Sequence, residues 1–139
     1  MRIAIDFDGT IVENRYPDIG KERPFATETI KQLSSDGHKL ILWTVRSGKS
    51  LEDALAWCNK HGVTFYSVNG NNPDGALSFS KKEASPKVDA DIYIDDKNIG
   101  GLPDWGDIYC RVSRKAYPGR HRHNHNRLKR WVKALFRLS

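Results

Sequence analysis

The sequence predicts an α/β fold: a Rossmann-like three-layer sandwich with a mostly parallel central sheet. Short apolar runs alternate along the chain with segments that have the amphipathic spacing of helices. Acidic residues directly follow two of the apolar runs, as expected where ligands bind at the carboxyl ends of parallel strands. The 139 residues are enough for one domain whose core needs no disulfide to stabilise it.

Residues 3–8 and 40–45 are the first two apolar runs, and they predict two buried strands. A helix is expected between them, because Pro24 suits the first helical position and Gly37 suits the end of the last turn. Its apolar face contains residues at near-helical spacing: Phe25, Ile30 and Leu33. Strands that alternate with helices in this way are typical of a parallel sheet.

A second helix is expected after residue 45. Ser50 and Asp53, three residues apart, predict a capping box at its start, and Gly62 suits its end. Its apolar face contains Leu51, Ala54, Leu55 and Cys58. Residues 63–68 then predict a third strand.

The second half of the chain has weaker signals. Residues 69–86 are polar and turn-rich and predict a long loop with at most a short helix. Residues 92–94 are apolar and run into Asp95 and Asp96, which predicts a fourth strand. Residues 108–110 are a candidate for a fifth.

Composition excludes several classes of protein. Two cysteines, Cys58 and Cys110, lie far apart, which excludes a disulfide-rich scaffold and a Cys-based zinc site. No apolar run approaches the roughly 18 residues of a transmembrane helix. Acidic residues within the first twenty are wrong for a signal peptide. We therefore expect a soluble protein of the reducing cytoplasm.

The net charge of +6 is unevenly distributed. Residues 1–110 contain 13 Lys and Arg against 17 Asp and Glu, whereas residues 111–139 contain ten Lys and Arg and no acidic residue. A uniformly basic nucleic-acid binder does not have this pattern. We expect a folded core over residues 1–110 and a basic C-terminal extension over residues 111–139.

Two pairs of acidic residues end predicted strands. Asp6 and Asp8 are two residues apart and are expected to point to the same side of the first strand. Asp95 and Asp96 end the fourth. Carboxylates that meet at one sheet edge repel one another unless a cation lies between them. Oxygen ligands that leave the coordination incomplete suit Mg²⁺, which a substrate phosphate would complete.

Four short motifs, in order, resemble those of the haloacid dehalogenase (HAD) superfamily of phosphotransferases. The first is Asp-Phe-Asp-Gly-Thr at residues 6–10, and the second is Thr44, which ends an apolar run. The third is Lys87, and the fourth is Ile-Asp-Asp at residues 94–96. Four motifs in the right order make this resemblance much more specific than any one of them.

The resemblance covers roughly residues 1–110 and is greatest to small capless bacterial members of the superfamily. Those members share segments that are found here at residues 16–17, 42–46 and 95–101. The resemblance implies a HAD-like fold. The stretch from Thr10 to Pro24 is too short for a folded cap domain, so we expect none.

The activity that the resemblance implies is Mg²⁺-dependent hydrolysis of a phosphomonoester. Asp6 would be the nucleophile and form an aspartyl-phosphate. Asp8 would protonate the leaving oxygen and then act as base for the hydrolytic water. Thr44 would donate to a phosphoryl oxygen, and Lys87 would neutralise the phosphoryl charge and steady Asp6.

The implied ligands follow from the same motifs. Mg²⁺ would be held by Asp6, the main-chain carbonyl of Asp8, and Asp95, while Asp96 would act through a water or orient a neighbour. The implied phosphate contacts are Gly9, Thr10, Thr44, Val45, Arg46 and Lys87. Lys81 and Lys82 are rivals for the role of Lys87. For Arg46 and Asn69, ordinary solvation in a loop is an equal alternative.

Substrate and partner classes remain open at this stage. A small phosphorylated metabolite is the leading substrate, and a phosphorylated nucleic-acid end is the alternative, because an open site selects small substrates poorly by enclosure. A receiver-like phosphoaspartate module is the alternative that is not an enzyme. In receivers the Lys follows the acid pair, whereas Lys87 precedes Asp95 and Asp96.

The basic extension has an apolar stripe at helical spacing: Leu128, Trp131, Val132, Leu135 and Phe136. We expect an amphipathic helix that packs on the core or on a second copy of the chain. Binding to an anionic membrane or to nucleic acid is the alternative for its basic residues. Three alternating histidines, His121, His123 and His125, make a transition-metal site a weaker alternative.

Overall fold

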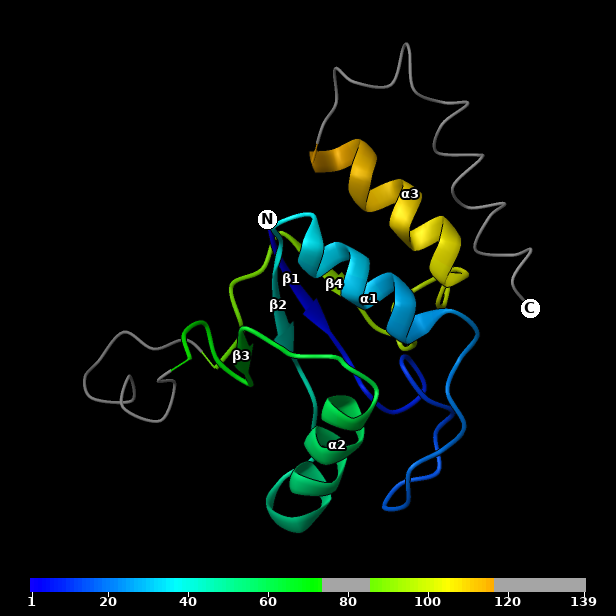
Figure 1. The fold of residues 1–139 in the computed structure, drawn as a ribbon, viewed down its shortest axis with the longest axis vertical. Helices are drawn as coiled ribbons and strands as arrows, with labels where there is room; N and C mark the ends of the chain where they lie inside the picture. Colours follow the sequence, from blue (N-terminus) through cyan, green and yellow to red (C-terminus); the bar gives the residue numbers. More distant parts are fainter. Residues whose placement is uncertain (74–85, 117–139) are drawn as a thin grey trace. The chain divides into compact units, whose positions relative to one another are not determined.

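The structure is a computed structural model that describes residues 1–73 and 86–116 (Figure 1). The chain divides into two compact units, Met1–Leu102 and Pro103–Ser139. The described part of the first unit contains the strands β1 to β4 and the helices α1 and α2. The helix α3 belongs to the second unit.

A parallel sheet is the centre of the first unit. Its four strands, in the order β3-β2-β1-β4, are β3 (Ser67–Val68), β2 (Lys39–Leu42), β1 (Arg2–Ile5) and β4 (Ile92–Ile94). In register, Ile3 pairs with Leu40 of β2 and with Ile92 of β4. The predicted α/β class with a Rossmann-like parallel sheet is confirmed. The carboxyl end of β1 is flanked by a neighbouring strand on each side.

The sheet is buried on both faces. On one face Ala4 and Ile41 pack with Val88, and partly buried side chains surround them: Trp43, Ala90 and Tyr93. Because side chains alternate along a strand, Ile3 and Ile5 point to the other face, where they are fully buried. Continuous apolar runs are what a parallel strand covered on both faces requires.

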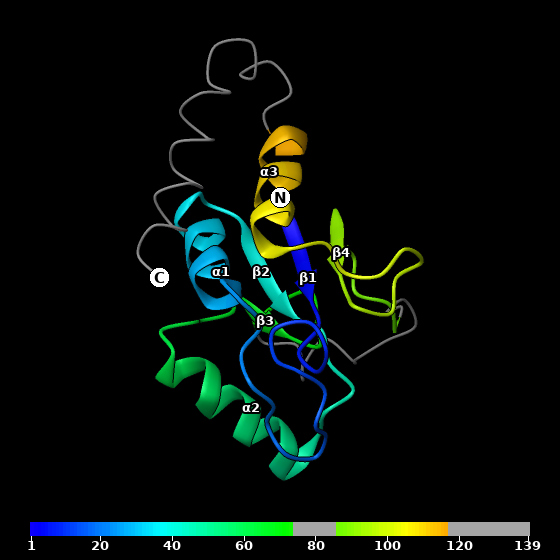
Figure 2. The same ribbon diagram turned by 90° about the vertical axis from the view of Figure 1, so that its right-hand side faces the viewer.

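The helix α1 (Ala26–Ser35) packs against β2 (Figures 1 and 2). Its N-cap residue is Phe25, so Pro24 lies before the helix and its predicted place at the first helical position is wrong. Glu22 satisfies its first turn, because its carboxylate accepts hydrogen bonds from the Thr27 amide at 2.9 Å and the Thr27 hydroxyl at 2.6 Å. Gly37 ends the helix as predicted, with a φ of 88° that favours glycine.

The helix α2 (Gly48–Lys60) lies beyond the carboxyl ends of the strands (Figure 1). It begins before Ser50, so the predicted capping box is wrong. Ser47 is the N-cap residue, and the Ser50 hydroxyl donates to the Ser47 carbonyl at 2.8 Å. The carboxylate of Asp53 pairs with Lys49 one turn away and so does not cap the helix.

The strands are shorter than the apolar runs that predicted them. β1 ends at Ile5, before Asp6 and Asp8, and β2 ends at Leu42, before Thr44. β3 has only two of the six residues expected at 63–68. The candidate site residues therefore lie in loops just beyond the strands.

The second unit begins with α3 (Trp105–Ala116), which stands where a fifth strand was a candidate. The predicted strand is wrong, because the buried residues recur at helical spacing rather than alternating. They are Trp105, Ile108, Tyr109 and Val112. This i, i+3, i+4, i+7 pattern extends on both sides of the three apolar residues that predicted a strand.

Residues 74–85 and 117–139 lie outside the described residues. Lys81, Lys82, the histidine run and the expected C-terminal helix fall in these segments, so the structure does not describe them. Within residues 1–73 and 86–116, no helix is long and apolar enough to cross a lipid bilayer.

Candidate active site

The candidate site lies at the carboxyl ends of three neighbouring strands. Asp6 follows β1 directly, Asp95 follows β4 directly, and Thr44 follows β2 after one intervening residue. Because the strands are parallel, these ends meet at one edge of the sheet. The central position of β1 places Asp6 between the other two.

Three carboxylates come together at this edge. Asp6, Asp95 and Asp96 each place an oxygen within 4.8 Å of the other two. Carboxylate oxygens grouped in this way suit a hard divalent cation such as Mg²⁺. Asp96, for which the sequence predicts an indirect role, thus supplies the third carboxylate of the group.

The carboxylate of Asp8 does not belong to this group, although it was expected to point to the same side as Asp6. Its two oxygens accept from Arg46 instead, and β1 ends at Ile5, so the strand alternation behind that expectation does not extend to Asp8. Cation binding by the main-chain carbonyl of Asp8 remains a prediction.

Asp6 is the most strongly perturbed acid of the site. Its pKa is raised from the usual 3.8 to about 7, chiefly by burial, and the negative charges of Asp95 and Asp96 act in the same direction. The hydrogen bond from Thr10 acts in the opposite direction. A cation bound among the three carboxylates would favour the ionised form of Asp6.

Thr10 connects two of these carboxylates. Its hydroxyl lies 3.0 Å from Oδ2 of Asp6 and 3.3 Å from Oδ1 of Asp96, and its one proton can be donated to either oxygen. The same hydroxyl oxygen accepts the Asp96 amide at 3.0 Å. Thr10, predicted as a phosphate contact, is placed as the residue that joins the first and fourth motifs.

Glycine is required at position 9 because the side chain of Asp96 lies very close to its Cα. Its φ is 88°, and a Cβ there would lie 2.7 Å from Cγ of Asp96. Any larger residue would therefore displace a carboxylate of the cluster. Arg23 fixes the same turn, because its Nε donates to the Gly9 carbonyl at 2.9 Å.

Thr44 is held by hydrogen bonds on both sides. Its amide donates to the Asn69 side-chain oxygen at 2.8 Å, and its hydroxyl accepts the Arg46 amide at 3.1 Å. Among the described contacts the Thr44 hydroxyl donates to no protein group, so its proton can serve a ligand oxygen. Asn69 thus positions the loop that carries Thr44.

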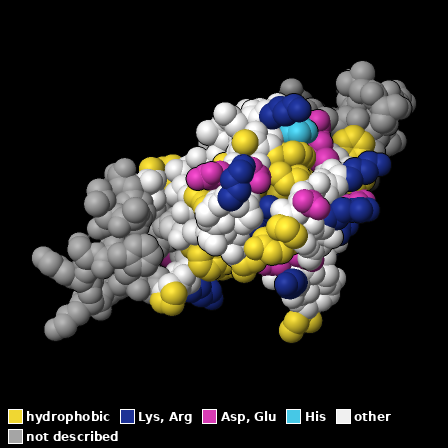
Figure 3. All heavy atoms as spheres, turned by 90° about the horizontal axis from the view of Figure 1, so that it is seen from below, with side chains coloured by type: hydrophobic (Ala, Val, Ile, Leu, Met, Phe, Trp, Pro, Cys, Tyr) yellow, Lys and Arg dark blue, Asp and Glu magenta, His cyan; other side chains and the backbone are white. Residues whose placement is uncertain are grey.

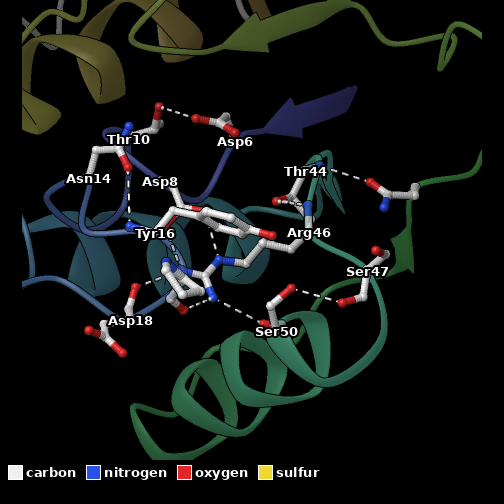
Figure 4. A network of polar contacts seen from close by, with 12 residues as sticks. Asp6, Asp8, Thr10, Asn14, Tyr16, Asp18, Thr44, Arg46, Ser47 and Ser50 are labelled. Atoms are coloured by element: carbon white, nitrogen blue, oxygen red, sulfur yellow. Dashed lines mark hydrogen bonds and ion pairs between the residues drawn. The ribbon is translucent and has the colours of Figure 1, made fainter.

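Arg46 is buried rather than solvated. Its guanidinium donates to both carboxylate oxygens of Asp8 at 2.7 Å, and its remaining N–H groups donate to main-chain carbonyls (Figure 4). The hydrogen bond with Asp8 raises the pKa of Arg46. Neither a phosphate contact nor loop solvation describes this residue, because every guanidinium N–H is used within the protein.

Lys87 and Val45 lie at the surface. The Lys87 ammonium is 5.3 Å from the ring centroid of Tyr93, on the strand that leads into Asp95. Val45, next to Thr44, is 91% exposed. Their predicted contacts with a phosphate remain predictions.

Sequence reasoning missed the supporting roles of Asn69 and Arg23. Asn69 lies 25 residues from Thr44 in sequence, and Arg23 lies 14 residues from Gly9. Both contacts are between loops, and no local periodicity signals them. The one available signal was the position of Asn69 immediately after a strand.

The surface around α2 carries both signs of charge. Figure 3 views the molecule from below Figure 1 and shows Lys and Arg side chains mixed with Asp and Glu, with hydrophobic areas between them. No broad basic field covers the described part of this face.

A comparison with solved structures finds a conserved protein from Bacteroides thetaiotaomicron. The two chains are 51% identical, the match covers 83% of this chain and 91% of the other, and the TM-score is 0.76. This chain belongs to the family of that protein. No curated protein and no protein-family model matches the sequence. The family thus has a known structure, and the function rests on the chemistry of the site.

Proposed function

We propose that this protein is a Mg²⁺-dependent phosphomonoester hydrolase of the HAD type, which acts through an aspartyl-phosphate on Asp6. The observation that carries the proposal is the cluster of Asp6, Asp95 and Asp96 at the carboxyl edge of a parallel sheet. Thr44 follows the neighbouring strand at the same edge. The order of the four sequence motifs supports the same conclusion.

The carboxylate cluster fits a divalent cation. Asp6, Asp95 and Asp96 would hold Mg²⁺, and the raised pKa of Asp6 reflects burial and repulsion that a cation would offset. When bound, Mg²⁺ supplies positive charge that screens the Asp6 carboxylate from an anionic phosphate.

In the first step, a carboxylate oxygen of Asp6 attacks phosphorus. An O–P bond forms to Asp6 as the ester O–P bond breaks, and the leaving oxygen takes a proton from Asp8. The pair with Arg46 uses one site on each Asp8 oxygen, and the proton would occupy a remaining one. The Thr44 hydroxyl donates to a phosphoryl oxygen, and Lys87 supplies positive charge.

In the second step, water attacks the phosphorus of the aspartyl-phosphate. Asp8 takes a proton from this water, the O–P bond to Asp6 breaks, and inorganic phosphate leaves. Asp6 returns as a carboxylate and Asp8 regains its proton. The cycle consumes one water and converts a phosphomonoester to an alcohol and phosphate.

The substrate we propose is a small phosphorylated metabolite. Mixed charge around α2 favours it over a polyanion, because a polyanion is normally bound by a basic surface (Figure 3). A phosphorylated nucleic-acid end is the second candidate, and the ten basic residues of 111–139 are the observation that favours it.

Phosphate release tests the proposal. Purified protein is assayed on phosphorylated metabolites and on oligonucleotides with 5′- or 3′-phosphates, with Mg²⁺ and with EDTA. We expect turnover with Mg²⁺ on one chemical class, and none with EDTA or with Asp6→Asn. Turnover that survives in EDTA or in the folded Asp6→Asn variant would contradict the proposal.

A further inference from the structure

We infer that Arg46 is a positioning residue. It sets the spacing between the loop that carries Asp6, the proposed nucleophile, and the loop that carries Thr44, the proposed hydrogen-bond donor to the phosphate. The inference rests on the proposed function and names a residue that the reaction needs but that touches neither substrate nor metal. It is carried by the complete set of hydrogen bonds that the guanidinium makes with surrounding loops.

Every N–H group of the Arg46 guanidinium has an acceptor. Nε and Nη2 donate to Oδ2 and Oδ1 of Asp8, each at 2.7 Å. Nη1 donates to the carbonyls of Pro17 at 3.0 Å and Ser50 at 3.1 Å, and Nη2 also donates to the Asp18 carbonyl at 2.7 Å. A guanidinium has five N–H donors, and these contacts use all of them.

The group is also enclosed. The Arg46 side chain has no exposed surface, and the Asp8 side chain is 10% exposed. The Phe7 and Tyr16 rings each lie with their centroids 5.2 Å from the guanidinium carbon, and Figure 4 shows the Tyr16 ring beside it. A buried guanidinium whose donors all have acceptors is held in one position and orientation, so it can fix the positions of the groups around it.

The contacts tie together the segments that carry the site. Asp8 is two residues after Asp6, and Arg46 is two residues after Thr44, with its amide bonded to the Thr44 hydroxyl at 3.1 Å. The Asp8–Arg46 pair therefore fixes one loop relative to the other. The hydrogen bond from Arg46 to the Ser50 carbonyl also links the first turn of α2 to these two loops.

Lysine cannot replace this residue. An ammonium keeps the charge, but it has three donors on one atom and cannot span two carboxylate oxygens and three carbonyls. Arg46→Lys therefore preserves the charge of the buried group and removes its geometry. The matched control is Arg15→Lys, the same substitution at an exposed residue of the loop that follows β1.

The test measures kcat and KM for the phosphatase reaction, together with Mg²⁺ affinity and thermal unfolding. For Arg46→Lys we expect kcat to fall by about 100-fold, the effect of a small misplacement of reacting groups. KM and Mg²⁺ affinity should change little, because Asp6, Asp95 and Asp96 are untouched. Arg15→Lys should match the wild type throughout.

Two further readouts separate positioning from simple loss of folding. Guanidinium ion, added to Arg46→Ala far below denaturing concentrations, should restore part of kcat, whereas methylammonium should not. Amide hydrogen exchange should become faster in residues 8–18 and 44–47 of Arg46→Lys, with β1 and β2 themselves unchanged. The exchange measurement needs no turnover.

The outcomes distinguish the two proposals. If the wild type hydrolyses no phosphomonoester, the proposed function fails, and hydrogen exchange alone decides the inference. If the wild type is active and Arg46→Lys keeps its kcat, the inference is wrong. It is equally wrong if the loss of kcat equals the loss of folded protein and guanidinium restores nothing, or if exchange in both loops is unchanged.

Discussion

In the proposed mechanism Asp6 has to be ionised to attack phosphorus, yet its surroundings oppose ionisation. Burial and the charges of Asp95 and Asp96 raise its pKa to about 7, although hydrogen bonds from the Thr10 hydroxyl and the Phe7 backbone favour the carboxylate form. A cation shared with Asp95 and Asp96 would reverse this balance. In the proposed mechanism, metal binding would therefore also activate Asp6 as the nucleophile.

The pKa of Asp6 predicts how Mg²⁺ binding depends on pH. Because the proton and the cation compete for the same carboxylate, Mg²⁺ affinity should be about tenfold weaker at pH 6 than at pH 8. Titration calorimetry at the two pH values measures this difference. The Asp6→Asn variant should bind Mg²⁺ more weakly and with little dependence on pH. An affinity of the wild type that is equal at both pH values would contradict the assignment.

The same shift predicts the stability of the metal-free protein. The folded form holds the Asp6 proton up to pH about 7, whereas the unfolded chain loses it near 3.8. The stability from protonation is therefore complete below pH 3.8 and lost as the pH rises to 7. Added Mg²⁺ should raise the unfolding temperature more at pH 8 than at pH 6.

Gly9 and Gly37 form a natural pair for a test of the close approach to Asp96. Both have a φ of 88°, but a Cβ would meet Asp96 at Gly9 and nothing within 4 Å at Gly37. Gly37→Ala should cost about 1–2 kcal/mol in the free energy of unfolding, from backbone strain alone. Gly9→Ala should cost more and weaken Mg²⁺ binding on the order of tenfold. Denaturant unfolding and Mg²⁺ titration of both variants measure the difference. Equal effects of the two substitutions would contradict the role of the close contact between Gly9 and Asp96.

At the scale of elements, the apolar runs predicted where the strands are but not where they end. The runs continue past Ile5 and Leu42 into loops, where Phe7 is fully buried and Trp43 is partly buried against the sheet, whereas Val45 is exposed. Three apolar residues at 108–110 likewise suggested a strand, although they lie within the helix α3. Helical spacing over a longer window, from Trp105 to Val112, was the better signal.

The helix α1 packs against the sheet and contains none of the candidate site residues. Leu33 is fully buried, whereas Lys31 on the same helix is exposed. Leu33→Ala should lower the free energy of unfolding by about 2–5 kcal/mol, from lost burial and a cavity. Lys31→Ala should change it by less than about 0.5 kcal/mol. Under folding conditions both variants should keep the wild-type kcat per folded molecule, and a large loss of kcat in Leu33→Ala would show that α1 does more than support.

At the scale of the whole molecule, the sequence predicted the α/β class, the parallel sheet and the acidic edge. The sequence did not predict that Asp8 and Arg46 form an ion pair, because 38 residues separate the two in sequence. The same holds for the hydrogen bond between Asn69 and Thr44. Strand-end chemistry follows from local pattern, whereas contacts between loops depend on the complete fold.

Deletion of the basic C-terminal segment distinguishes between the two proposed substrate classes. Deletion of residues 120–139 removes most of the basic extension. If the substrate is a small metabolite, kcat/KM should stay near the wild-type value. If it is a nucleic-acid end, kcat/KM on oligonucleotides should fall by orders of magnitude, and the wild-type value should decrease steeply with salt. Phosphate release at several salt concentrations decides between them.

The most direct measurement is the detection of phosphate on Asp6 itself. Protein mixed with Mg²⁺ and acetyl phosphate is quenched in acid, reduced with borohydride and mapped by peptide mass spectrometry, because reduction converts an aspartyl-phosphate to homoserine. We predict homoserine at position 6 in the wild type, none without Mg²⁺, and none in Asp6→Asn. Modification at Asp8, Asp95 or Asp96 with Asp6 intact, or turnover without any modified aspartate, would contradict the mechanism.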